Sequence, residues 1–350
     1  MNKNKALLRR RAILALSAAA LSTTSARAQT QTAALALIAA ATKEGTAVFH
    51  TSIDLPVAQK MVTDFQSLYP GIRIQLERTG AERVLQRIEQ EYASNIKAAD
   101  VIESSDVTMF LGWKKKNWLA TYIPAEVARV WPKDEKDPDG QFAAVRAQLS
   151  VIAYNTKQIK PEDAPKSFAD LLAPKWKGRM VKAHPGYSGT IVTSTYATEK
   201  ALGWPYFDSL AKQRILQVQS ASDPPKKVAQ GERSIMVDGS EYVVFYLREL
   251  GNPIQEVYAT EGSPLISGQV AVMKEAPHPN AARLFAEYVF SARCQQLMAD
   301  AGGTRSFHPD VKLAPGRKPL SEIKVLRSVP TELEASIEEV KQKYTEYFGV

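Results

Sequence analysis

The chain has 350 residues, of which 45% are hydrophobic, and this is typical of a globular protein with one large or two medium domains. Its formal net charge is +8, but residues 1–28 hold six basic residues and no acidic one, so the rest carries only 39 basic against 37 acidic residues. This balance of +2 gives little support for a nucleic-acid-binding protein.

The first 28 residues have the three parts of a secretory signal: a basic start, an apolar middle and a small-x-small end, ARA. Cleavage is expected before Gln29, and we therefore expect residues 1–28 to be a signal peptide. Residues 10–14, RRAIL, fit a twin-arginine pattern, and an ordinary Sec signal is the alternative export route.

Beyond this leader, no apolar run approaches 18 residues, so we expect no membrane span in the mature chain. The only cysteine is Cys294, and one thiol cannot form an internal disulfide. Cys294 lies in a helix-like apolar run, which predicts a buried structural thiol.

Residues 46–104 alternate between the patterns of strands and helices. Short apolar strand patterns stand at GTAVFHTS, IRIQLE and ADVIES, and the segments PVAQKMVTDFQSLYPG and AERVLQRIEQEYA between them show helical spacing. Strand, helix, strand, helix and strand in this order predict an α/β sheet with parallel strands.

Small polar residues follow each of these strands where a helix begins. At the carboxyl ends of parallel strands, hydroxyls and free amide N–H groups can bind an anion or a hydrogen-bonding ligand. Plain helix capping is the alternative explanation. The candidate residues of this wall are Thr51, Ser52, Asp54, Thr79, Gly80, Ser104 and Ser105.

The second half of the chain repeats this design. A further strand and a helix start supply the candidates Tyr187, Ser188, Gly189 and Thr190. The segment DGSEYVVFYLREL adds Asp238, Glu241 and Tyr242. Tyr242, in the first turn of a helix, is expected to line the cleft, whereas Tyr246 and Leu250 are expected to pack in the core. From residue 332 onward the tail is charged and helix-forming.

Catalytic and metal motifs are weak in this sequence. Its four histidines have no partner at metal-ligand spacing, and GYSGT misses the nucleophile-elbow pattern by one position. No Walker loop and no GxGxxG after a strand are present. We therefore expect no cofactor and no enzyme, and a secreted hydrolase with a dispersed triad is the alternative.

Three long segments resemble a known family. PKSFADLLAPKWKGRM, GSPLISGQVAVMKEAPHPNAARLFAEYVFS and VFHTSIDLPVAQKMVTDFQSLYPGIRI resemble bacterial extracellular solute-binding proteins of ABC transporters. The subfamily resembled binds ferric iron, phosphonates and small organic ions. Together the resemblance covers most of residues 44–312.

The resemblance implies a two-lobed periplasmic-binding-protein fold of type 2, in which two three-layer α/β lobes close on the ligand. Two hinge crossovers are expected near Leu149–Asn155 and Ile266–Val272. Lobe 1 would comprise residues 29–150 and 270–350, and lobe 2 residues 151–269. The resemblance also implies a periplasmic protein that delivers its solute to an inner-membrane ABC permease.

The ligand expected from the polar turns is a small anionic or zwitterionic solute, of the phosphonate or organic-acid type. Ferric iron is the alternative, because iron-binding members of the resembled family have two adjacent tyrosines where this chain has Glu241 and Tyr242. Their histidine and glutamate positions hold Ile53 and Ser105 here. Since Fe(III) requires several anionic oxygens, Tyr242 and Glu241 are metal candidates only under that alternative, and no metal site is otherwise expected.

Overall fold

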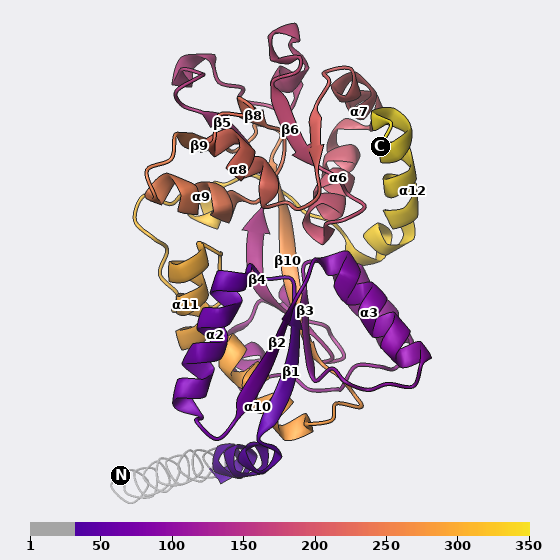
Figure 1. The fold of residues 1–350 in the computed structure, drawn as a ribbon, viewed down its shortest axis with the longest axis vertical. Coiled ribbons are helices and arrows are strands. Elements are labelled where there is room, and N and C mark those ends of the chain that lie inside the picture. Colours follow the sequence, from indigo (N-terminus) through magenta and orange to yellow (C-terminus); the bar gives the residue numbers. More distant parts are fainter. Residues whose placement is uncertain (1–31) are drawn as a thin grey trace, which may run out of the picture.

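A computed structural model of the chain describes residues 32–350. Figure 1 shows two lobes stacked along the long axis of the molecule, each built on its own sheet. The expected signal peptide, residues 1–28, lies outside the described residues. Within residues 32–350, no helix has the length and apolar character needed to cross a bilayer.

The first lobe is built on a six-stranded sheet in which parallel and antiparallel pairs mix. The strand order is β11-β10-β3-β1-β2, and β4 also pairs with β10. β1 runs parallel to β2 and β3, as the sequence predicts, whereas β10 is antiparallel to β3 and β4. The strands are β1 (Thr46–Thr51), β2 (Arg73–Arg78), β3 (Val101–Ser104), β4 (Ala143–Leu149), β10 (Ser263–Val272) and β11 (Val325–Leu326).

The helices of the first lobe cover this sheet with their apolar faces. In α2 (Leu55–Leu68), Val57, Met61 and Phe65 recur at helical spacing and are buried. The ring of Phe65 lies 5.1 Å from the ring of Phe285. Each such side chain contributes about 1.5–3 kcal/mol through burial. Besides helical residues 32–44, these helices are α2 (Leu55–Leu68), α3 (Ala81–Ala93), α4 (Val107–Lys115), α5 (Ala125–Val130), α10 (Pro279–Phe290) and α11 (Ala292–Gly302).

The second lobe has a five-stranded sheet in the order β7-β6-β8-β5-β9, with β6 parallel to β7 and β8. Its strands are β5 (Ile152–Asn155), β6 (Met180–Ala183), β7 (Leu216–Val218), β8 (Ile235–Met236) and β9 (Ile254–Val257). Its helices are α6 (Gly189–Leu202), α7 (Trp204–Ala211), α8 (Asp223–Ala229), α9 (Glu241–Glu249) and α12 (Pro330–Phe348). Short 3₁₀ turns lie at Lys133–Glu135, Pro161–Asp163, Ala169–Leu172, Pro174–Trp176 and Leu320–Glu322.

The chain first crosses between the lobes from β4 to β5, inside the expected range Leu149–Asn155. The return lies earlier than expected, at residues 258–262 between β9 and β10. Ile266–Val272 cannot be a connection because these residues already pair with β4 and β3 in the first sheet. The apolar run SPLISGQVAV is one long strand.

A third passage between the lobes leads from β11 to the C-terminal helix α12. There Leu333 and Val340 pack with Val192 and Tyr196 of α6, although the resemblance implies that residues 270–350 belong to lobe 1. Figure 1 shows α12 alongside α6 and α7. We propose lobe boundaries of 32–150 with 263–328, and 151–262 with 329–350.

Candidate functional site

A cavity of about 380 Å³ lies between the two lobes, at the carboxyl ends of their parallel strands. Turns after β1, β2 and β3 form one wall, and turns after β6, β7 and β8 form the other. The residues that line it are Ser52, Asp54, Arg78, Gly80, Ala81, Glu82, Arg83, Gln86, Ser105, Arg146, Gln148, Gly186, Tyr187, Ser188, Gly189, Thr190, Gln219, Ser220, Ala221, Ser222, Ser240 and Tyr242.

The floor of the cavity holds a buried ion pair. Arg146 Nη2 lies 2.9 Å from Glu103 Oε1 and 3.4 Å from the hydroxyl of Ser52. Burial is the largest single effect and would lower the pKa of Arg146, but Glu103, Tyr242 and Asp54 together outweigh it and raise the pKa. Arg146 is therefore a permanent positive charge that faces the cavity.

The carboxylate of Glu103 also connects Arg146 to the turn after β1. Its Oε2 accepts hydrogen bonds from the hydroxyl of Thr51 at 2.7 Å and from the backbone N–H of Ser52 at 2.9 Å. Thr51 is fully buried and does not line the cavity. Its side chain orients the turn that carries Ser52.

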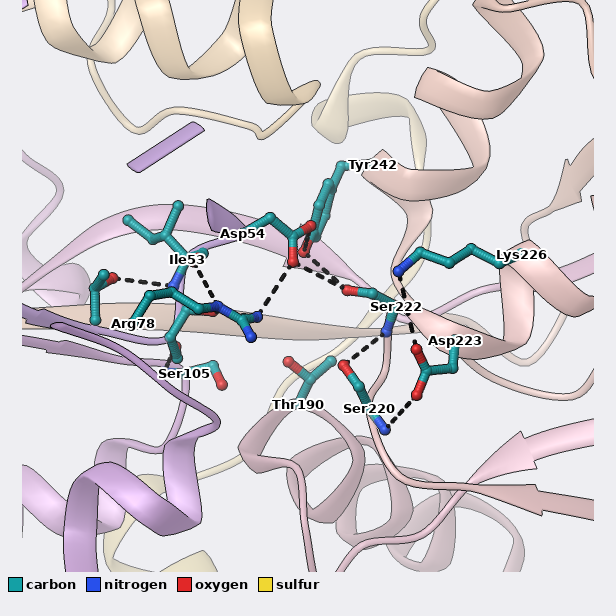
Figure 2. A network of polar contacts seen from close by, with 12 residues as sticks. Ile53, Asp54, Arg78, Ser105, Thr190, Ser220, Ser222, Asp223, Lys226 and Tyr242 are labelled. Atoms are coloured by element: carbon teal, nitrogen blue, oxygen red, sulfur yellow. Dashed lines mark hydrogen bonds and ion pairs between the residues drawn. The ribbon is translucent and has the colours of Figure 1, made fainter. Parts of the chain in front are cut away.

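The two lobes meet directly at Asp54. Its carboxylate accepts hydrogen bonds from the Tyr242 hydroxyl at 3.0 Å and from the Ser222 hydroxyl at 3.4 Å, both from the second lobe. Arg78 Nη2 of the first lobe lies 3.4 Å from the same carboxylate. Figure 2 shows these side chains pointing toward one another across the cleft. We call this cluster the Asp54 bridge.

Helix starts bring further hydrogen-bond donors to the cavity. α3 begins after Gly80 and α6 begins after Ser188, and both residues line the cavity. The first N–H groups of a helix have no partner within it, and the helix dipole gives them a partial positive charge. The two helix starts and the side chains of Arg78 and Arg146 make this region favourable for an anion.

The lobes approach each other closely at Gly189. A Cβ atom at this position would lie 2.8 Å from Asp106 Cβ, so only glycine fits while the lobes are in contact. Asp106 is buried and accepts a hydrogen bond from the Thr108 N–H at 2.9 Å, and burial raises the pKa of its carboxyl. Beside this contact, Gln148 Nε2 of the first lobe donates to Thr190 Oγ1 of the second at 2.5 Å.

Other candidates from the sequence lie outside the cavity lining. Thr79 is half-buried at the end of β2, and its N–H donates to the backbone oxygen of Thr51 at 3.1 Å. Ser104 is buried, and its hydroxyl oxygen accepts the N–H of Asp106 at 3.2 Å. Both residues shape the turns and do not contribute side chains to the wall.

The two acidic candidates of the second lobe do not line the cavity, and the two arginine partners of Glu241 belong to residues 263–328 of the first lobe. Asp238 is buried in an ion pair with Lys182. Glu241 receives Arg305 Nη2 and Arg317 Nη2, each at 2.7 Å, one on each carboxylate oxygen. Burial alone would raise the pKa of Glu241, but the hydrogen bond from Arg305 and both positive charges lower it. Neither carboxylate is directed at the cavity.

Several lining residues were missed by sequence reasoning. Arg146 and Gln148 lie two apart in the apolar strand β4, so their side chains share one face, and this polar pair was a usable signal. Ser220 and Ser222 follow β7 in QSAS, which repeats the polar-turn pattern of the other strand ends. Arg78 is the last residue of its strand.

No group of three or more His, Cys, Asp or Glu side chains that could hold a metal ion occurs within residues 32–350. Tyr242 is buried at the Asp54 bridge. Burial and then the Asp54 carboxylate raise the pKa of its phenol, which keeps the proton on the oxygen.

Comparison with known proteins identifies the family. Residues 97–320 match the family of bacterial extracellular solute-binding proteins. The chain is 24% identical to iron uptake protein A1 of a Synechocystis strain over 253 residues, covering 65% of this chain and 67% of that protein. It is 26% identical to an Fe(3+)-binding periplasmic protein of Serratia marcescens over 116 residues, 33% of each chain.

Solved structures of periplasmic binding proteins share the fold. AfuA of Actinobacillus pleuropneumoniae, with bound fructose-6-phosphate, superposes with a TM-score of 0.78 at 22% identity, covering 87% of this chain and 99% of that one. Iron-bound HitA of Pseudomonas aeruginosa gives 0.75 at 22% identity, with 85% and 99% covered. The chain belongs to the bacterial extracellular solute-binding protein family, and it is a solute-binding component of an ABC importer, not an enzyme.

Proposed function

We propose that this protein captures a small anionic or zwitterionic solute, of the phosphonate or organic-acid type, in the cavity between its lobes. It carries the solute through the periplasm, after export by the Sec or twin-arginine route, to an inner-membrane ABC permease. The observation that carries the proposal is the convergence of Arg78, Arg146 and the starts of α3 and α6 on one cavity.

The chemistry of the cavity supports an oxyanion. Guanidinium groups bind carboxylates and phosphonates through charge-assisted hydrogen bonds, and helix starts favour negative charge. Hydroxyls of Ser52, Ser105 and Thr190 add neutral donors on both walls. An ammonium group on the same solute would find the carboxylates of Asp54 and Glu82, which also line the cavity. An aminoalkylphosphonate carries both groups.

We propose that two sets of cavity-lining residues contact the ligand: those that the sequence predicts and those that only the structure reveals. The first set is Ser52, Asp54, Gly80, Ser105, Tyr187, Ser188, Gly189, Thr190 and Tyr242, and the second is Arg78, Arg146, Gln148, Ser220 and Ser222.

Ferric iron is the second candidate, because proteins named for iron uptake and Fe(3+) binding are among the relatives. Tyr242 would be its phenolate ligand and Asp54 a carboxylate ligand. Against it, Arg78 and Arg146 bring positive charge to the same place, and Glu241 is engaged by two arginines. On adding Fe(III), we expect no Tyr242-dependent charge-transfer band; a strong band lost in Tyr242→Phe would favour iron.

The proposal is tested by a matched pair of substitutions at the two ends of β2. Arg78→Gln should lower the affinity for 2-aminoethylphosphonate by about 10- to 100-fold, as for a lost charge-assisted hydrogen bond. Arg73→Gln, at the exposed far end of the strand, should leave the affinity unchanged. Equal affinities of both variants in calorimetric titrations would rule out an anion at Arg78.

A further inference from the structure

A second cavity of about 440 Å³ lies on the other side of the Asp54 bridge. Asp54, Arg78, Ser220, Ser222 and Tyr242 line both cavities, so the two cavities adjoin at the bridge. The second cavity is also formed by both lobes: the start of α2 and the end of α11 face α8 and α9 across it.

The walls of the second cavity are apolar, in contrast to the first. From the first lobe they are Leu55, Pro56, Val57, Ala301 and Gly302, and from the second Val243, Tyr246 and Leu247. Leu55 is 45% exposed and Tyr246 is 50% exposed. The sequence predicts that Tyr246 and Leu250 pack in the core, but Tyr246 is half exposed and Leu250, directly after the helix, is exposed too.

Leu55 and Tyr246 line the same concave site, and such exposed apolar surface is unfavourable in water until a ligand covers it. The rim adds positive charge. No carboxylate within residues 32–350 lies at ion-pair distance from Lys60, whereas Lys226 lies 3.9 Å from Asp223. The lining holds three basic side chains, Lys60, Arg78 and Lys226, against two acidic ones, Asp54 and Asp223, and this balance of +1 favours a molecule that carries negative charge.

We propose that the two cavities form one extended site for an amphipathic organic anion. This inference rests on the proposed function: the anionic group binds Arg78 and Arg146 in the first cavity. An aromatic or alkyl portion then lies between Leu55 and Tyr246 in the second cavity. The linking atoms pass at the Asp54 bridge, where the Tyr242 hydroxyl donates to Asp54.

The test compares ligands with one anionic group and different apolar portions. Methylphosphonate is paired with benzylphosphonate and acetate with phenylacetate, and each is titrated calorimetrically into the full mature protein. Burial of the phenyl ring should raise the affinity within at least one pair by about tenfold or more. Ala301→Trp fills the second cavity and should reduce the long ligand to the affinity of the short one, which itself stays unchanged.

A matched control and a second variant keep this test decisive. Ala335→Trp adds the same side chain at an exposed position of α12 that lines neither cavity, and it should leave both affinities unchanged. Leu55→Asn removes an apolar wall without adding bulk, and it should also reduce the advantage of the long ligand.

The possible failures are distinguishable. If the short and long members of each pair bind equally, the extended site is overturned while the anion site stands. The same holds if the advantage of the ring survives both Ala301→Trp and Leu55→Asn. If no member of either pair binds, the anion site is overturned, and the extended site falls with it.

Discussion

The buried carboxylate of Glu241 joins three distant parts of the chain. It receives Arg305 and Arg317 on its two oxygens, and the Tyr258 hydroxyl donates to it at 2.6 Å. The side chains of Glu241, Arg305 and Arg317 are almost fully buried. We infer that Glu241 stabilises the fold and does not contact the solute.

Substitution of Glu241 tests this role. Glu241→Gln leaves two buried guanidinium groups without their carboxylate and should lower the free energy of unfolding by about 3–5 kcal/mol. Affinity for an organic anion should be unchanged. Glu249→Gln, exposed on the same helix, is the control for urea unfolding and titration. Wild-type stability combined with lost binding would instead make Glu241 a ligand residue.

His184 supports the loop that carries Tyr187 and Ser188 into the cavity. Its Nδ1 accepts a hydrogen bond from the Gly186 N–H at 2.9 Å, which requires a neutral ring. Burial and then the charge of Lys182 lower the pKa of His184 below the ordinary value of 6.5, against a smaller raising effect of Val350.

This geometry predicts a loss of stability on acidification. Because the unfolded chain binds the proton more readily, unfolding becomes easier as the pH falls below 6.5 toward the lowered pKa of His184. His184→Asn keeps an acceptor for Gly186 and should remove this part of the pH dependence. Urea unfolding of both proteins between pH 7.5 and 5.5 is the measurement, and identical pH profiles would contradict the role of His184.

At the scale of elements, α12 contacts both lobes. Its apolar face packs on α6, and its Glu334 lies 2.7 Å from Lys115 of α4 in the first lobe. Lys341 lies 3.6 Å from Glu82, at the wall of the cavity. The packed face, not the exposed ion pairs, should carry most of the stability.

Leu333→Ala separates these contributions. Leu333 is completely buried, so its truncation should lower the free energy of unfolding by about 2–5 kcal/mol. Glu334→Gln, the next residue, removes an exposed ion pair and should change it by at most about 1 kcal/mol. Thermal and urea unfolding measure the change in free energy for both variants. Equal changes would show that the ion pairs of α12 contribute as much stability as its packed face.

Sequence patterns located the strands and the turns after them, because apolar periodicity and small polar residues are local signals. Ser52, Ser105 and Ser188 were found in this way. The partners of Asp238 and Glu241 could not be found, since Lys182 and Arg305 lie 56 and 64 residues away.

The lobe that we propose for α12 differs from the sequence assignment for a similar reason: an amphipathic helix shows which face is buried but not against which partner.

At the scale of the whole molecule, the two lobes are in contact at Gly189 and Asp106. A methyl group at Gly189 would meet the backbone of Asp106 at 2.9 Å, so Gly189→Ala should destabilise the closed arrangement by about 1–3 kcal/mol. Each lobe keeps its own core, so the folded state should persist.

The expected results are a larger radius of gyration by small-angle scattering and weaker binding of organic anions. Gly112→Ala is the control, because its added methyl meets no atom within 4 Å. Unchanged scattering and affinity in Gly189→Ala would show that the lobes bind the solute without this contact.

The central claim is that the cleft binds a small organic anion, and a ligand panel followed by thermal unfolding tests it most directly. The panel contains phosphonates, carboxylates, polyamines and Fe(III), each at saturating concentration. We predict that a phosphonate or carboxylate stabilises the protein, by about 2.7 kcal/mol at a hundredfold excess over Kd, and that polyamines and Fe(III) do not. Stabilisation by Fe(III) or a polyamine, with none by any organic anion, would contradict the account.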